Sequence, residues 1–132
     1  MNSETFSISD LTREFDISAR SIRFYEEKGL ISPQRTRGNQ RRYTPSDRYR
    51  LKWILRGKRF GYSLDEISRM LGLVDAEAKA ADQIRTILAY GEKKLKDIEN
   101  HIEELHLMRS EILDLKDKLL KRLNELERTH AT

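Results

Sequence analysis

The sequence predicts an all-α fold with a small β wing, in which short helices fill the first half of the chain and one long helix fills the second. Three observations support this fold class. Five of the six glycines and both prolines lie within the first 72 residues, where such breakers separate short elements. Helix-capping pairs recur at close intervals in the same part. The remaining residues contain one glycine, no proline and a heptad-like apolar repeat.

Composition excludes several classes of chemistry. The chain has 132 residues, of which 36% are charged and 37% hydrophobic, so a large enclosed core is out of reach. The absence of cysteine excludes disulfides, thiolate zinc sites, iron–sulfur clusters and a cysteine nucleophile. No apolar run is long enough for a membrane helix, and the first residues lack the features of a signal peptide. We therefore expect a cytoplasmic protein that makes no membrane contact.

The two halves of the chain differ in charge. Residues 1–72 contain 15 Lys and Arg against 9 Asp and Glu, a net charge of +6, whereas residues 73–132 contain 11 against 13, a net charge of −2. Between Arg35 and Arg59 there are ten basic residues and a single acid, Asp47. Such a dense positive surface favours a polyanion such as nucleic acid. The alternative is a solvated basic face without a partner.

Helix-start signals predict four short helices, at about residues 8–15, 19–28, 45–59 and 64–71. Three of them begin with a hydroxyl placed three residues before a carboxylate, the pattern of a capping box: Ser7 and Asp10, Thr44 and Asp47, Ser63 and Glu66. Pro45 suits the first helical position, and Gly72 is expected to close the fourth helix in a left-handed cap.

The first two helices are separated by only three residues, with Ser18 as a plausible cap for the second. This spacing predicts a helix-turn-helix, whose second helix can enter the major groove of DNA. Ile22 is expected to point inward. The groups suited to base edges and phosphates come from Arg20, Ser21, Arg23 and Tyr25. The alternative is an ordinary amphipathic helix.

Residues 32–43 predict a basic hairpin directly after the second helix. Gly38-Asn39 is a turn dipeptide, with Arg35 on one arm and Arg41 on the other. A hairpin at this place is a wing, which reaches phosphates beside the groove that the helix occupies.

A breaker-poor segment from about residue 76 to residue 128 predicts one helix, on the order of 75 Å long at about 1.5 Å per residue. Its apolar stripe includes the dimerisation residues that we predict, namely Leu95, Ile98, Ile102, Leu105, Ile112, Leu115 and Leu119. The simplest partner for this stripe is the same helix of a second chain, and the two helices would form a homodimeric coiled coil. The alternative is an intramolecular hairpin broken near Gly91 or Asn100.

Several blocks together resemble the N-terminal domain of MerR-family transcriptional regulators. They are Phe6-Ser-Ile-Ser-Asp-Leu-Thr, Ser-Ile-Arg-Phe-Tyr-Glu-Glu-Lys-Gly-Leu at 21–30, Ser32-Pro33, Arg41-Arg-Tyr-Thr-Pro-Ser-Asp47 and Phe60-Gly-Tyr-Ser-Leu-Asp-Glu-Ile67. The resemblance implies a winged helix-turn-helix DNA-binding domain at 1–73 and a long dimerisation helix with a short tail at 74–132, paired as an antiparallel coiled coil.

The resemblance also implies residue roles. Together with Ser21, the implied contacts to double-stranded DNA are Arg20, Arg23, Phe24 and Tyr25 from the second helix, Arg41 and Tyr43 from the wing, and Lys58 or Arg59 from the third helix. One departure concerns the wing, where Gln40 stands at a position that is commonly aromatic in the family. A homodimer of this type is expected to bind a pseudo-palindromic promoter element and to bend and untwist it, so that RNA polymerase engages both promoter boxes.

The signal to which the protein responds is less constrained. Metal- and redox-sensing MerR proteins use cysteines that this chain lacks, and His101 and His106 are spaced five apart, which does not place them on one helix face. We therefore predict no metal, no cofactor and no enzymatic activity. The phrase at 48–67 looks most like a cysteine-free subgroup that regulates branched-chain amino acid, isovalerate and fatty-acid utilisation, which suggests an acyl-CoA-like organic effector. The alternative function is a sequence-nonspecific architectural or coiled-coil interaction protein.

Overall fold

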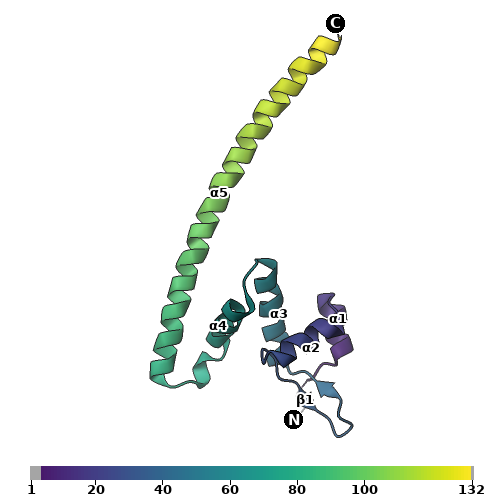
Figure 1. Cartoon of the computed structure of the whole chain (residues 1–132), viewed down its shortest axis with the longest axis vertical. Helices are drawn as coiled ribbons and strands as arrows, with labels where there is room; N and C mark the ends of the chain where they lie inside the picture. The colour runs from purple at the N-terminus through teal and green to yellow at the C-terminus, as the bar shows by residue number, and fades with distance from the viewer. Residues whose placement is uncertain (1–3, 132) are drawn as a thin grey trace. The chain divides into compact units, whose positions relative to one another are not determined.

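The computed structural model describes residues 4–131. The expectation that the first residues do not form a signal peptide lies partly outside this range. The elements are α1 (Ile8–Phe15), α2 (Ala19–Glu27), β1 (Gln34–Arg35), β2 (Arg41–Arg42), α3 (Pro45–Arg59), α4 (Leu64–Val74), a 3-10 turn η1 (Ala76–Ala78) and α5 (Ala81–Ala131). The chain divides into two compact units, one up to Ile87 and the other from Leu88 onwards. The predicted fold class is confirmed (Figure 1).

The helices begin where the capping signals predict. The side chains of Ser7, Ser18, Thr44 and Ser63 each accept a hydrogen bond from the backbone N–H three residues further on. At three of these sites the acid at the third position also accepts from the backbone of the capping residue, which completes the capping box. Between α1 and α2 the chain turns through Asp16, which adopts a left-handed conformation at φ 54° and ψ 49°. The helix-turn-helix is therefore built by local hydrogen bonds.

The wing is a short antiparallel hairpin in which Gln34 faces Arg42 and Arg35 faces Arg41. Its turn places Asn39 at φ 61°. The N-terminal segment pairs with Tyr43, the residue after β2, since the backbone N–H of Phe6 donates to the carbonyl of Tyr43 and the reverse bond is also formed, both at 2.8 Å. These bonds attach the base of the wing to the segment that leads into α1.

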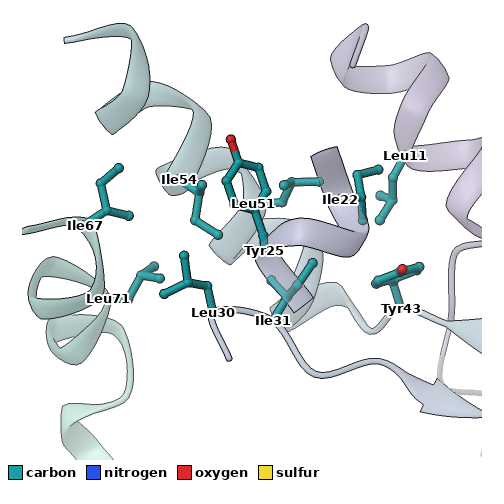
Figure 2. Close-up of a cluster of buried hydrophobic side chains, with 10 residues drawn as sticks. All are labelled: Leu11, Ile22, Tyr25, Leu30, Ile31, Tyr43, Leu51, Ile54, Ile67 and Leu71. Carbon is teal, nitrogen blue, oxygen red and sulfur yellow. The ribbon is translucent and has the colours of Figure 1, made fainter. Parts of the chain in front are cut away.

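One core holds α1, α2, α3 and α4 together. Its buried side chains are Leu11, Ile22, Tyr25, Leu30, Ile31, Tyr43, Leu51, Ile54, Ile67 and Leu71 (Figure 2). Ile22, which was expected to point inward, is fully buried in this core, whereas Ile8, Phe15 and Ile17 are partly buried and pack against it. The two tyrosines join this core although the sequence predicts them on the DNA-binding surface.

Two contacts fix α3 in the unit. Asp47 is buried, and its carboxylate accepts hydrogen bonds from the backbone N–H of Ser32 and from both the N–H and the hydroxyl of Thr44. This carboxylate therefore joins the segment after α2 to the start of α3. At the other end, Gly57 lets α4 approach closely, because a Cβ there would lie 2.7 Å from Cγ1 of Ile67.

The predicted end of the fourth helix is wrong. α4 continues past Gly72 to Val74, and Gly72 is not among the residues with positive φ. Val74 packs against the core, which gives the helix an apolar contact for one further turn. The chain then passes through Asp75, whose carboxylate pairs with Arg50 of α3, and through η1 before α5 begins.

α5 begins later than predicted, at Ala81 in place of residue 76, because η1 and a short extended segment precede it. It runs to Ala131 in place of 128, so that residues 129–131 of the predicted tail are helical. The helix is continuous through Gly91 and Asn100, and the intramolecular hairpin that we considered is therefore not formed (Figure 1). No helix among the described residues is long and apolar enough to cross a membrane.

Candidate nucleic-acid interface

The second helix of the helix-turn-helix has two different faces. Ile22 is fully buried, whereas Arg20, Arg23 and Phe24 are exposed. Ser21 is partly buried, and its N–H and hydroxyl both lie within hydrogen-bonding distance of the Ser18 hydroxyl, at 3.1 and 3.0 Å. Ser21 is thus engaged in the cap of α2. The exposed face carries the guanidinium groups that a major groove requires.

Phe24 is a partly exposed aromatic on this face, with 41% of its surface accessible. Its ring packs edge-on against Tyr25 at a centroid distance of 5.8 Å, and the ammonium of Lys28 lies 5.5 Å from its centroid. These contacts hold the ring against the helix, where it supports the basic face.

Tyr25 and Tyr43 lie in the core and are not part of the exposed surface. Tyr25 is 7% exposed and Tyr43 is fully buried, and burial raises the pKa of both phenols. Among the residues that the structure describes, the hydroxyl of Tyr43 has no hydrogen-bond partner. This conformation therefore does not support direct contact of either ring with DNA. Tyrosine has an apolar ring and a polar tip, so its position in the sequence alone did not distinguish packing from contact.

Glu26 of α2 contacts both strands of the wing. The carboxylate of Glu26 accepts a hydrogen bond from Nε of Arg41 at 2.7 Å, and its other oxygen lies 3.6 Å from Nη2 of Arg35. The hydrogen bond to Glu26 raises the pKa of Arg41 above the ordinary value of an arginine. Arg35 also donates to the carbonyl of Asn39 across the turn, at 3.1 Å.

A groove of about 310 Å³ lies where α2, the start of α1 and the wing meet. Its lining residues are Ser7, Ile8, Arg23, Asn39, Gln40, Arg41 and Arg42. The structure thus brings together Arg23 and Arg41, two of the predicted contacts from separate elements. Lys58 and Arg59 are exposed in the last turn of α3 and do not line this groove.

The sequence-based set of contacts omitted Arg42, which lines this groove, and the pair Glu26 and Arg35, which lies outside its lining. Arg42 lines it and donates from Nε to the hydroxyl of Thr5 at 3.0 Å. Glu26 and Arg35 form the contact between α2 and the wing. The basic hairpin was a signal for both arginines, whereas the pairing of Glu26 with Arg41 spans 15 residues and left no local pattern.

The second unit has an apolar surface of its own. Ile98 is partly buried. The other predicted dimerisation residues are exposed in the single chain, namely Leu95, Ile102, Leu105, Ile112, Leu115 and Leu119. An apolar groove of about 310 Å³ runs along α5, lined by Ile112, Leu115, Lys116, Leu119, Leu120 and Leu123. Leu107, Leu113 and Leu120 are also exposed, outside the predicted stripe.

The residues present do not fit a thiolate-bound metal. The chain contains no cysteine. Within residues 4–131 there is also no group of three or more His, Asp or Glu placed to hold a metal ion. Soft metal ions prefer thiolate ligands, so the chain lacks the donors that they require.

Family models match both parts of the chain. A model described as MerR HTH family regulatory protein matches residues 6–73, and a second, described as MerR, DNA binding, matches residues 48–115. The two matches overlap in α3 and α4 and together extend from the N-terminal segment to the middle of α5.

Individual relatives cover most of the chain. It is 37% identical over 116 residues to the mercuric resistance operon regulatory protein of Bacillus cereus, which covers 86% of this chain and 84% of that protein. It is 35% identical over 111 residues to the HTH-type transcriptional regulator CueR of Escherichia coli O157:H7, over 83% and 79% of the two chains. Among solved structures, HiNmlR, described as a MerR family regulator lacking the sensor domain and bound to promoter DNA, matches with a TM-score of 0.60 at 28% identity, over 77% and 76% of the two chains.

Proposed function

The chain belongs to the MerR family of helix-turn-helix regulatory proteins, and from this premise we propose that it binds a pseudo-palindromic promoter element as a homodimer and distorts it to control transcription. Proteins of this family are DNA-binding transcriptional regulators and not enzymes. The observation that carries the proposal is the basic groove that joins Arg23 of α2 to Arg41 of the wing.

In the proposed complex, α2 lies in the major groove and the wing lies beside it. Arg20 and Arg23 are exposed on α2 and are placed to reach base edges or phosphates. Arg41 contacts a flanking phosphate, and Lys58 or Arg59 adds a contact from the end of α3. Tyr25 and Tyr43 support this surface from the core, where their rings are buried.

The homodimer is proposed on the exposed stripe of α5. In water an isolated helix with apolar side chains on one face is poorly stabilised until that face packs against another surface. A second copy of α5, antiparallel to the first, offers a complementary stripe and places two winged heads for two half-sites. Contacts at both half-sites then offset the energy of bending and untwisting the DNA between them, so that RNA polymerase can engage the promoter.

We also propose that the signal is an organic molecule and not a thiophilic metal. The support is chemical, because the chain has no cysteine, although one relative is named for mercuric resistance. An acyl-CoA-like ligand is the first candidate, from the resemblance of residues 48–67 to the cysteine-free subgroup. Thermal-shift titration of the purified protein with coenzyme A thioesters tests it, and a flat response across the panel argues against this ligand class.

DNase I footprinting on the upstream region of the protein's own gene and its neighbours tests the DNA-binding proposal. We expect one protected, pseudo-palindromic site. On that site, Arg23→Ala should cost about 1–3 kcal/mol if Arg23 reads a base, while Arg41→Ala should weaken binding more evenly across sequences. Arg85→Ala, which removes the same charge from the start of α5, is the matched control. Protection without a discrete site would indicate a sequence-nonspecific architectural protein.

A further inference from the structure

The wing has little stability of its own. Each of its strands is two residues long, and a two-stranded hairpin is marginally stable in water even when it is longer. Its orientation therefore depends on contacts with the rest of the unit. At the base, these are the backbone bonds between Phe6 and Tyr43 and the bond from Arg42 to Thr5. They hold β2 but leave the direction of the hairpin relative to α2 unspecified.

Glu26 supplies the contact that joins the wing to α2. Its carboxylate meets Arg41 of β2 at 2.7 Å and Arg35 of β1 at 3.6 Å, so one side chain contacts both strands. The pair is partly buried, with side chains of Glu26 and Arg41 that are 21% and 30% exposed. A charge-assisted hydrogen bond in such a position is screened less by salt than a fully exposed one.

The contact also sets the geometry of the groove. Arg23 lies three residues before Glu26, which places it one turn away on the same side of α2. The opposite wall of the groove is formed by Asn39, Gln40, Arg41 and Arg42 of the wing. Because Glu26 is joined to Arg41, the separation of the two walls depends on this ion pair. The bond uses one of the five N–H groups of the guanidinium and leaves others to donate to a phosphate.

We propose that Glu26 is a positioning residue of the DNA-binding surface, whose carboxylate holds both strands of the wing against α2 so that Arg23 and Arg41 meet one stretch of DNA in register. This inference rests on the proposed function, namely operator binding by α2 and the wing. By charge alone, Glu26 should repel DNA. In this inference it nevertheless strengthens operator binding, because it orients the basic residues around it.

The test compares two variants of equal net charge. Glu26→Gln keeps the shape of the side chain and removes its charge, and Glu27→Gln makes the same change at the exposed neighbouring position of α2. Both variants gain the same general attraction for DNA. We titrate the full-length protein with operator and with random DNA. The operator Kd of Glu26→Gln should be roughly fivefold to twentyfold higher than that of Glu27→Gln, because a wing that is no longer held against α2 must be ordered when DNA binds. Affinity for random DNA should match between the two.

A double-mutant cycle separates positioning from a general loss of structure. Arg41→Ala should cost clearly less operator affinity in the Glu26→Gln background than in the wild type, because the wing is then no longer held in register. Circular dichroism and thermal unfolding of Glu26→Gln should match those of Glu27→Gln. Amide hydrogen exchange should speed up at the two wing strands and stay unchanged in α1 and α3.

The outcomes are distinguishable. Equal operator affinity of Glu26→Gln and Glu27→Gln overturns the inference, and so does tighter binding by Glu26→Gln, which would mean that Glu26 competes with DNA for the arginines. If the wild type protects no discrete site, the proposed function fails instead. Should Glu26→Gln unfold the unit, Arg35→Gln tests the same contact from the wing, with the exposed Arg37→Gln as control. A greater loss of operator affinity for Arg35→Gln is then expected, and equal losses overturn the inference.

Discussion

The unit up to Ile87 buries ten hydrophobic side chains in a core shared by four helices, whereas every side chain from His101 to His130 in α5 is exposed. The first unit combines short elements with contacts between residues far apart in the sequence, such as Asp47 with Ser32 and Arg48 with Glu14. α5 contains local pairs such as Lys121 with Asp117 and Arg122 with Glu125. Pairs of this kind contribute about 0.2–0.5 kcal/mol each. One unit is stabilised within the chain, whereas the other leaves most of its apolar stripe exposed in the single chain.

The largest effect is expected at the stripe of α5. Ile112→Glu places a charge in the proposed dimer interface, twice in a symmetric dimer, and should weaken dimerisation by about 1,000-fold or more, on the order of 4 kcal/mol. Sedimentation equilibrium measures the dissociation constant. Ser110→Glu introduces the same carboxylate about 200° around the helix and is the control. An unchanged dimer constant for Ile112→Glu would contradict the proposed interface.

A smaller effect, confined to the first unit, is expected in the core. Leu51 of α3 is fully buried, so Leu51→Ala should lower the free energy of unfolding of this unit by about 2–4 kcal/mol. The single tryptophan, Trp53, lies in α3 and reports the unfolding of this unit in urea. Lys52 is exposed beside Leu51, so Lys52→Ala should change the free energy of unfolding of this unit little. If Leu51→Ala weakened dimerisation as strongly as Ile112→Glu, the two units would not be independently stabilised.

The smallest effect concerns acid pH. Glu14 accepts hydrogen bonds from Arg48, which lower the pKa of its carboxyl below its ordinary value of about 4.5. Because the folded pKa lies below the unfolded one, the contribution of the pair is present above about pH 4.5 and is lost as the pH falls through the folded pKa. The pair is partly exposed, so we expect its contribution to the free energy of unfolding to be small. Urea titrations between pH 6 and pH 3 measure the free energy of unfolding of the first unit. In Glu14→Gln, and likewise in Arg48→Gln, this free energy should fall slightly less with decreasing pH than in the wild type. A steeper acid loss in either variant would contradict this assignment.

Where stabilisation is local, the sequence predicted the structure closely. Ser7, Thr44 and Ser63 each cap the helix that they were expected to cap, because a hydroxyl and an acid three residues apart satisfy backbone groups without help from distant residues. α1 and α3 have the predicted bounds for this reason. The continuous helix in the second half followed from its lack of breakers.

Where stabilisation is tertiary, the sequence was not sufficient. Gly72 was expected to end α4, but packing of Val74 against the core extends the helix. The burial of Tyr25 and Tyr43 depends on the helices and the segment that surround them, which no local pattern encodes. The same holds for Glu26, since its partners Arg35 and Arg41 come from the hairpin that follows. The exposed basic residues of the candidate site could be predicted, whereas the contacts that arrange them could not.

The exposure of α5 has a consequence for the lifetime of the protein in the cell. A helix whose residues lack tertiary contacts opens readily, and proteases cleave chains in such open states. A copy of this chain without a partner should therefore be degraded faster than a paired one. If the protein pairs with itself as proposed, its cellular concentration would control its turnover as well as its assembly, because copies too dilute to pair would be removed.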